Sequence, residues 1–337
     1  MRGMRGVVVG LWITVATGTV RAQEFEAAME EAQAEFEHGN LLPGLHLLLA
    51  LKERAQSDEQ RERLAAKLAE VGGSICDRGD FASGLRAFEA VVGLRKRVYG
   101  GRDHADVAAI LANVADCMES LGRAAEALPQ FEQALAMVKR LYGDRDHPDV
   151  AHGLSGVAGC LQSLGHAAEA LLQYEQALAM WKRLYGDRDN SDVAKGLNNV
   201  GYCVQSLGRA SEALLQYEQA LAMWKRLYGD RDNSDVAMGL NNVAYCLDSL
   251  GRTAEALPQF EQALAMWKRL RGDCDHPDVA RGLNNVAHCL KSLGRAAEAL
   301  PQFEQALAMW KRLNGDRDHP DVANGMNSVA SCMDSLV

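Results

Sequence analysis

Hydrophobic positions recur along this chain with helical spacing, in blocks that repeat every 43 residues. In one block, residues 191–207 carry apolar side chains at Val193, Leu197, Val200, Val204 and Leu207. Residues 210–227 carry a second stripe at Leu214, Tyr217, Ala220, Leu221, Trp224 and Leu227. Spacings of three and four place side chains on one face of an α-helix. Each block is therefore predicted to form two antiparallel helices of ~17 residues, about 25 Å long.

Residues at the block boundaries support this assignment. Asn190 stands where an N-cap is needed, and Asp192 places a carboxylate in the first turn, where the helix dipole favours it. Sister blocks have proline at the first helical position, at Pro148, Pro277 and Pro320. The glycine of a Ser-Leu-Gly tripeptide recurs at Gly122, Gly165, Gly208, Gly251 and Gly294. This glycine is predicted to end the first helix of each block.

A single helix pair of this kind cannot bury its own apolar faces. Repetition at a fixed period predicts that neighbouring pairs stack and complete the core between them. Tryptophan keeps the same period on the second-helix stripe, at Trp181, Trp224, Trp267 and Trp310. We therefore expect these tryptophans to be core residues.

The block carries a known pattern. Leu240, Val243, Ala244 and Leu247 are followed by Gly251 and then by Ala256, Phe260 and Ala263. This pattern resembles the tetratricopeptide repeat. The longer block, with Asp275-His-Pro-Asp-Val-Ala280 before Gly-Leu-Asn-Asn-Val, is similar to the repeats of kinesin light chains over about residues 102–337. The resemblance implies an all-α fold, a right-handed superhelical solenoid of stacked antiparallel helix pairs, whose first helices line a concave, peptide-binding wall.

The pattern divides the chain into four predicted segments. Residues 1–22 are predicted to be a signal peptide and residues 23–101 degenerate N-terminal helical repeats, beginning with a hairpin around Gly39. Residues 102–317 form the repeat array. Residues 318–337 supply a half-repeat, predicted to be a capping helix, with a truncated sequence as the alternative.

The N-terminal segment has the features of an export signal. Arg2 and Arg5 precede an apolar run from Val7 to Val20, and Val20-Arg-Ala22 provides small residues for cleavage. A signal peptide predicts a secreted, periplasmic or lumenal protein. An uncleaved membrane anchor, a transit segment and a misassigned start are the alternatives, and without export the protein would be cytoplasmic. A membrane partner is expected only if the segment stays attached.

Composition narrows the classes of function. The chain is 48% hydrophobic and 24% charged with a net charge of −9, which argues against a nucleic-acid partner. Phosphate-loop, zinc-protease and hydrolase motifs are absent from the sequence, so we expect no enzyme activity, cofactor or metal. The recurring His104, His147, His276 and His319 precede first helices and are interpreted as caps.

Six of the eight cysteines share one repeat position: Cys117, Cys160, Cys203, Cys246, Cys289 and Cys332. Equivalent positions on stacked helices lie ~8–10 Å apart, which exceeds disulfide reach. These six are interpreted as small core thiols, with a ligand or redox role as the alternative. Cys274 replaces a loop arginine and is predicted to be exposed and the most reactive.

The face of the first helix opposite the apolar stripe supplies the candidate site. Its predicted peptide-binding residues are Lys195, Asn198, Asn199, Tyr202, Gln205, Asn241, Asn242, Tyr245, Asp248, Arg281, Asn284, Asn285, His288 and Lys291. By resemblance, the asparagine pairs form a ladder that holds a peptide backbone, since a carboxamide both donates and accepts. We expect Arg281, His288 and Lys291 to favour an acidic residue, and the two tyrosines an apolar or aromatic one.

The blocks differ from each other mainly at this face, for example at Lys195, Met238 and Arg281, while second-helix surfaces recur almost unchanged. Drift at exposed positions and tuning toward a ligand are both open explanations. The leading hypothesis is a non-catalytic scaffold that binds a protein or peptide partner of unknown identity. The alternative is a structural component that self-associates or bridges complexes through its outer face and ends. The sequence leaves the oligomeric state open.

Overall fold

The chain folds into helix pairs, as the hydrophobic period predicts. A computed structural model describes residues 23–272, 274–314 and 319–336. The predicted signal peptide lies outside these residues, so its assignment stays a prediction. Every regular element in the described residues is helical. The chain divides into two compact units, Met1–His166 and Ala167–Val337.

The first unit begins with helical residues 23–37. Its remaining helices are α2 (Leu41–Leu51), α3 (Asp58–Asp77), α4 (Phe81–Val98), α5 (Ala105–Ser120), α6 (Ala124–Tyr142) and α7 (Pro148–Ser163). Gly39 has a positive φ of 81° between the first two helices, as the predicted hairpin requires. Helices α3 and α4 pack together as one pair, and α4 also packs against α5 of the next pair.

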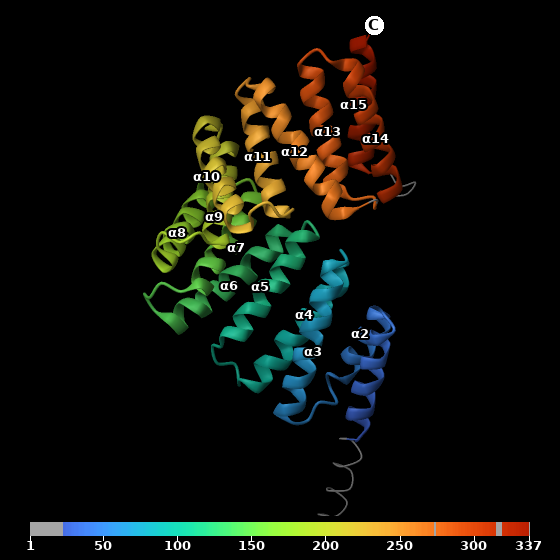
Figure 1. Cartoon of the computed structure of the whole chain (residues 1–337). Helices are drawn as coiled ribbons and strands as arrows, with labels where there is room; N and C mark the ends of the chain where they lie inside the picture. The colour runs from blue at the N-terminus through green and yellow to red at the C-terminus, as the bar shows by residue number, and fades with distance from the viewer. Residues whose placement is uncertain (1–22, 273, 315–318, 337) are drawn as a thin grey trace, which may run out of the picture. The chain divides into compact units, whose positions relative to one another are not determined.

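The second unit continues the same alternation (Figure 1). It contains α8 (Ala167–Tyr185), α9 (Ser191–Ser206), α10 (Ala210–Tyr228), α11 (Ser234–Ser249), α12 (Thr253–Arg271), α13 (Pro277–Ser292), α14 (Ala296–Asn314), α15 (Pro320–Met333) and the short 3₁₀-helix η1 (Asp334–Leu336). Each helix packs against the next along the chain. The stacked helix-pair architecture predicted from the period is confirmed.

Helix ends follow the predicted chemistry. The Asn190 side chain accepts hydrogen bonds from the backbone N–H groups of Asp192 and Val193 and so caps α9. Gly208 has φ +77°, and the N–H of Arg209 bonds the carbonyl of Val204, which closes the helix in a Schellman motif. His104, His147, His276 and His319 cap first helices through Nδ1, as predicted.

The core lies between the helices of successive pairs. Trp224 is fully buried, and Trp181, Trp267 and Trp310 are at most 9% exposed, which confirms their assignment. The six cysteines that share a repeat position are buried and free, whereas Cys274 is exposed. Leu207 was expected in the apolar stripe but is 39% exposed, because it is the C-cap of α9 and lies past its last full turn.

Candidate functional site

The predicted site residues lie on three first helices of the second unit, α9, α11 and α13. Lys195, Tyr202, Tyr245, Arg281 and His288 are exposed. The partly exposed residues are Asn199, Gln205, Asn241, Asn242, Asp248, Asn284, Asn285 and Lys291. Asn198 is only 8% exposed and is the one buried polar residue of the described chain. The face therefore presents cations, aromatic rings and amides to solvent, whereas Asn198 lies beneath it.

Four of the six asparagines bond to each other across helices. Asn242 Nδ2 donates to Asn198 Oδ1 at 2.8 Å, which joins α11 to α9. Asn285 Nδ2 donates to Asn241 Oδ1 at 2.8 Å, which joins α13 to α11 in the same way. In each bond, the second asparagine of one pair reaches the first asparagine of the preceding pair. The amide ladder thus fixes the spacing of the first helices and keeps its remaining N–H and C=O groups for other partners.

The ladder ends at α15. Ser328 occupies the repeat position of Asn285 and is too short to reach back to Asn284. Within the part of the chain that the structure describes, the side chain of Asn284 makes no hydrogen bond. A cavity of about 400 Å³ opens here, lined by Arg281, Asn284, His288, Trp310, Asn324 and Asn327, among others. The cavity thus lies where the next bond of the asparagine ladder is missing.

Asn327 is a lining residue that the sequence-based prediction omits. It stands at the same repeat position as Asn198, Asn241 and Asn284, so the periodicity contained the signal. The adjacent serine obscured the pair, because the prediction relied on two consecutive asparagines. Asn199, at the other end of the series, also makes no hydrogen bond among the described residues.

Three predicted residues are held by other side chains rather than presented freely. Gln205 Oε1 accepts a hydrogen bond of 2.9 Å from the Tyr217 hydroxyl, and its buried Nε2 has no partner in the described chain. Asp248 Oδ1 accepts a bond of 2.7 Å from Thr253 Oγ1. Lys291 Nζ donates to Ser331 Oγ at 2.5 Å. Gln205, Asp248 and Lys291 share one repeat position. The residue at this position joins its first helix to a neighbouring helix, which its variability did not indicate.

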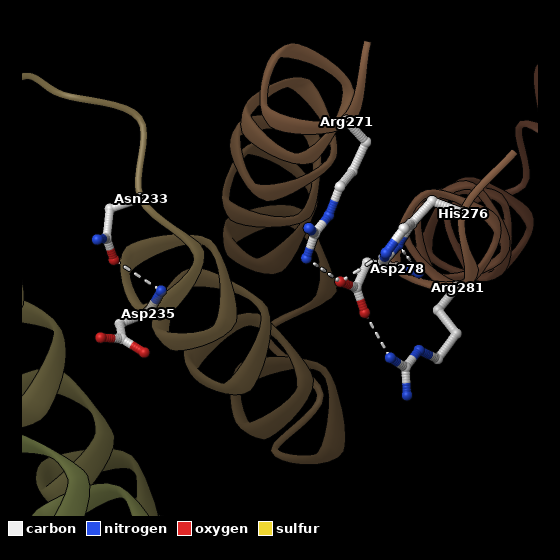
Figure 2. A network of polar contacts seen from close by, with 6 residues as sticks. All are labelled: Asn233, Asp235, Arg271, His276, Asp278 and Arg281. Atoms are coloured by element: carbon white, nitrogen blue, oxygen red, sulfur yellow. Dashed lines mark hydrogen bonds and ion pairs between the residues drawn. The ribbon is translucent and has the colours of Figure 1, made fainter. Parts of the chain in front are cut away.

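Positive charge gathers at α13. Arg281 Nη2 donates to Asp278 Oδ1 at 2.5 Å, and Arg271 from α12 approaches the other carboxylate oxygen at 3.4 Å (Figure 2). The backbone N–H of Asp278 donates to His276 Nδ1 at 3.1 Å, as that of Asp235 does to the Asn233 cap one block earlier. The Arg281 side chain stays 65% exposed. Asp278 thus binds one terminal nitrogen of the Arg281 guanidinium, while most of the side chain faces solvent.

His288 was expected to favour an acidic residue together with Arg281 and Lys291. Its ring packs edge-on against Phe303, with centroids 4.8 Å apart and an interplanar angle of 82°. Burial and the nearby Lys291 ammonium lower the pKa of His288, and the Asp248 carboxylate opposes them only in part. The lowered pKa favours the neutral form of the ring. Positive charge at this end comes from Arg281 and Lys291, and His288 offers a neutral ring.

A second ladder runs between the loops and the second helices. Arg226 makes a two-pronged ion pair with Asp189, Arg269 with Asp232, and Arg312 with Asp275, all at 2.6–2.8 Å for the closest contact. Each of these arginines is exposed at the end of a second helix and reaches the loop of the preceding block, so it joins neighbouring pairs.

Neither a metal site nor a membrane-spanning helix is found in the described residues. No group of three or more histidine, cysteine, aspartate or glutamate side chains within them could hold a metal ion. None of their helices is both long enough and apolar enough to cross a membrane.

Solved structures support the fold. The chain matches the kinesin light chain TPR-like repeats of Podosopora anserina over 64% of its length and 100% of theirs, at 20% identity and a TM-score of 0.52. BtubC (BKLC) of P. vanneervenii matches over 82% of this chain and 94% of its own, at 21% identity and a TM-score of 0.55. A Rap protein complexed with competence and sporulation factor matches over 94% and 98%, at 14% identity and a TM-score of 0.56. At these identities the likeness concerns the fold alone. No curated protein sequence matches significantly.

The family is established by the sequence itself. A tetratricopeptide repeat model matches residues 63–140, 106–183, 192–269, 235–312 and 278–336, which together make up most of the chain. The matched segments contain the first helices that carry the amide ladder and the second helices that carry the tryptophans. This chain belongs to the tetratricopeptide repeat family.

Proposed function

We propose that this protein is a non-catalytic scaffold that holds an extended segment of a partner protein along α9, α11 and α13. The observation that carries the proposal is the exposure of Tyr202 and Tyr245. They are 55% and 58% exposed, at equivalent positions of neighbouring first helices. Large aromatic side chains left in water beside a polar ladder are typical of protein-binding surfaces.

The amides would hold the backbone of the segment. An extended peptide has unpaired N–H and C=O groups, and a carboxamide can satisfy either. Asn199 and Asn284 have both amide groups available, and the three bonded asparagines that are partly exposed, Asn241, Asn242 and Asn285, keep a second N–H or carbonyl. The bonded amides are also held in place by the ladder, so they lose little side-chain entropy on binding. This arrangement favours a backbone grip that is independent of the partner's sequence.

The side-chain preference would come from the flanking positions. Tyr202 and Tyr245 would stack on an apolar or aromatic residue. Arg281 lines the cavity between α13 and α15, and its side chain is mostly exposed. Its guanidinium would bind a carboxylate of the segment in that cavity, with Asn284 as a neutral donor beside it. The partner is thus an extended segment with an aromatic residue before or after an acidic one.

Peptide arrays test this function directly. The full chain is expected to retain peptides that combine an aromatic residue with an acidic residue and to release them when either is replaced by alanine. The double variant Tyr202→Ala/Tyr245→Ala removes the rings from an exposed surface and is expected to lose capture. Leu215→Ala is the matched control, since Leu215 is 54% exposed on the second helix α10. Equal capture by the tyrosine variant and the control would contradict the proposal.

The compartment is part of the same proposal. If residues 1–22 are a cleaved signal peptide, the partner segment meets this protein in a secretory or periplasmic compartment. N-terminal sequencing of protein expressed in a host with its own signal peptidase measures the outcome. A mature chain that begins just after Ala22 supports export, and an intact N-terminus opposes it.

Self-association is the second candidate, and a specific observation favours it. On α15, Met326 and Met333 are 49% and 53% exposed, whereas Leu283 and Leu290 at the same repeat positions of α13 are at most 5% exposed. We infer that a second copy of this chain covers this apolar face. Light scattering is expected to show a concentration-dependent dimer that Met326→Lys abolishes. A monomer at all concentrations would leave the peptide scaffold as the sole candidate.

A further inference from the structure

Two cysteine sulfur atoms from different helix pairs lie next to each other in the first unit. Cys76 is on α3, the first helix of one pair, and Cys117 is on α5, the first helix of the next pair. Their Sγ atoms are 3.4 Å apart. Cys117 is buried, Cys76 is half-buried, and both are free thiols.

The repeat register explains why these two residues meet. Cys76 stands at the repeat position of Glu119, which varies from block to block, and Cys117 stands at the position of Cys160. One block later, Cys160 Sγ lies 3.9 Å from Glu119 Oε2. The same pair of positions is thus in contact at successive junctions. At these two junctions the residue at the variable position therefore faces the recurring cysteine of the next pair.

A glycine makes room for the Cys76 sulfur. A Cβ atom on Gly84 of α4 would overlap with Cys76 Sγ and would lie 3.7 Å from Cys117 Sγ. Every later block has a fully buried alanine at this position: Ala127, Ala170, Ala213, Ala256 and Ala299. The one block with cysteine at the variable position is also the one with glycine here. The sulfur occupies the space that an alanine methyl fills elsewhere.

We propose that Cys76 and Cys117 form a reversible disulfide that ties α3 to α5, with a disulfide-containing oxidant such as oxidised glutathione or a protein disulfide. The sulfur atoms must approach from 3.4 Å to about 2.05 Å, which a change of side-chain rotamer can supply. The bond would join the first helices of neighbouring pairs, which otherwise contact each other mainly through α4. The proposal is independent of the peptide-binding function.

The reaction follows from the exposure of the two thiols. Cys76 is the accessible one, so its thiolate attacks the oxidant, forms a mixed disulfide and releases one reduced thiol. The Cys117 thiolate then attacks the Cys76 sulfur, closes the protein disulfide and releases the second thiol. The oxidant gains two electrons, and the protein loses two electrons and two protons. Burial raises the pKa of both thiols, that of Cys117 to about 12, so the exchange accelerates as the pH rises.

Peptide mapping of the oxidised full chain tests the proposal. The Cys274→Ser background removes the exposed thiol, so that links between molecules do not interfere. The folded protein is treated with oxidised glutathione, alkylated, digested and analysed by mass spectrometry without reduction. The expected product is one peptide pair that joins Cys76 to Cys117 and is separated by dithiothreitol. Persistence of both thiols as alkylated residues would overturn the proposal, as would a link that forms only in urea.

Two further variants separate this chemistry from a chance contact. Cys76→Ser is expected to abolish the link and to leave Cys117 alkylatable. Gly84→Ala keeps both thiols but places a methyl group where the Cys76 sulfur lies, so the link is expected to form about tenfold more slowly. Circular dichroism is expected to show an unchanged helical content, since alanine is the residue of the other blocks. An unchanged rate in folded Gly84→Ala protein would overturn the assigned geometry.

Discussion

Asn242 on α11 donates a hydrogen bond of 2.8 Å to Asn198 on α9, and the acceptor is 8% exposed. The bond joins two helix pairs that are 43 residues apart in the sequence. Because Asn198 is buried, its carbonyl oxygen has no water to replace a lost donor. Asn198 is therefore a buried ladder member that stabilises the fold, whereas the partly exposed Asn199 and Asn284 are available to a partner.

Asn242→Ala is expected to destabilise the protein. The variant leaves a buried carbonyl oxygen without a donor, which costs about 1–3 kcal/mol. Asn284→Ala is the matched control, because Asn284 makes no hydrogen bond in the described chain, and its cost is expected to stay within about 0.5 kcal/mol. Urea unfolding followed by circular dichroism measures both. Similar losses for the two variants would show that the ladder bond contributes nothing.

The double variant Asn198→Ala/Asn242→Ala isolates the pair. Removal of both partners leaves no unsatisfied group, so the double variant is expected to lose less free energy of unfolding than the sum of the single losses. Strict additivity would place the two amides out of contact in solution.

Tyr202→Ala and Tyr245→Ala are expected to weaken peptide capture at little cost to the fold. Both rings are more than half exposed, so each substitution is expected to change the free energy of unfolding by at most about 0.5 kcal/mol. A ring at the centre of a contact, in contrast, contributes about 2 kcal/mol or more to binding. Isothermal titration with a peptide selected on the array measures the loss of affinity. A large loss of thermal stability instead would make the rings structural.

Much of this architecture could be predicted from the sequence, for local reasons. Gly208 ends α9 and Trp224 is buried because backbone conformation and helical spacing act within a single block. The amino acids alone also identify the surface that carries Tyr202 and Tyr245. What these predictions share is that each depends on residues within one or two helical turns of each other.

The errors concern contacts between helices. Gln205 and Lys291 were expected to be free on the groove, but each bonds a side chain of a neighbouring helix. Helical spacing gives the angle of a side chain around its own helix. It does not give the neighbour that a long side chain reaches. The Cys76–Cys117 contact escaped prediction for the same reason, because its two residues occupy different repeat positions on different helices.

Arg271→Tyr is expected to stabilise the protein. In four earlier blocks a tyrosine at this position bonds the first-turn aspartate, and Tyr142 also stacks on the His147 cap with ring centroids 3.5 Å apart. Arg271 instead makes a long contact of 3.4 Å with Asp278 and leaves His276 without a stacked ring (Figure 2). A tyrosine would restore both interactions, worth about 1 kcal/mol together.

The reverse exchange provides the control. Tyr142→Arg removes the stacked ring and the hydroxyl bond to Asp149 and is expected to lower stability by a similar amount. Thermal unfolding of the two variants beside the parent chain measures both. If Arg271→Tyr lowers the unfolding midpoint, the local environment of α13 has adapted to arginine rather than lost a tyrosine.

The ion-pair ladder predicts a specific pH dependence. The hydrogen bond from Arg269 holds the pKa of Asp232 below its ordinary value. A carboxylate whose pKa is lower in the folded state stabilises the fold above its unfolded pKa, about 3.9. That contribution is lost as the pH falls through the folded pKa. Asp232→Asn is therefore expected to be less stable than the parent chain at pH 6, and the difference is expected to shrink below about pH 4.

Urea unfolding from pH 6 down to pH 2.5 measures the difference between parent and variant. Asp230→Asn is the matched control, because Asp230 lies in the same loop and makes no ion pair among the described residues. The comparison cancels the general acid destabilisation that all three proteins share. Added salt is expected to reduce the Asp232→Asn difference at pH 6, since the pair is partly exposed and screened. A difference that is unchanged at pH 2.5 would mean that Asp232 acts through loop packing rather than through its charge.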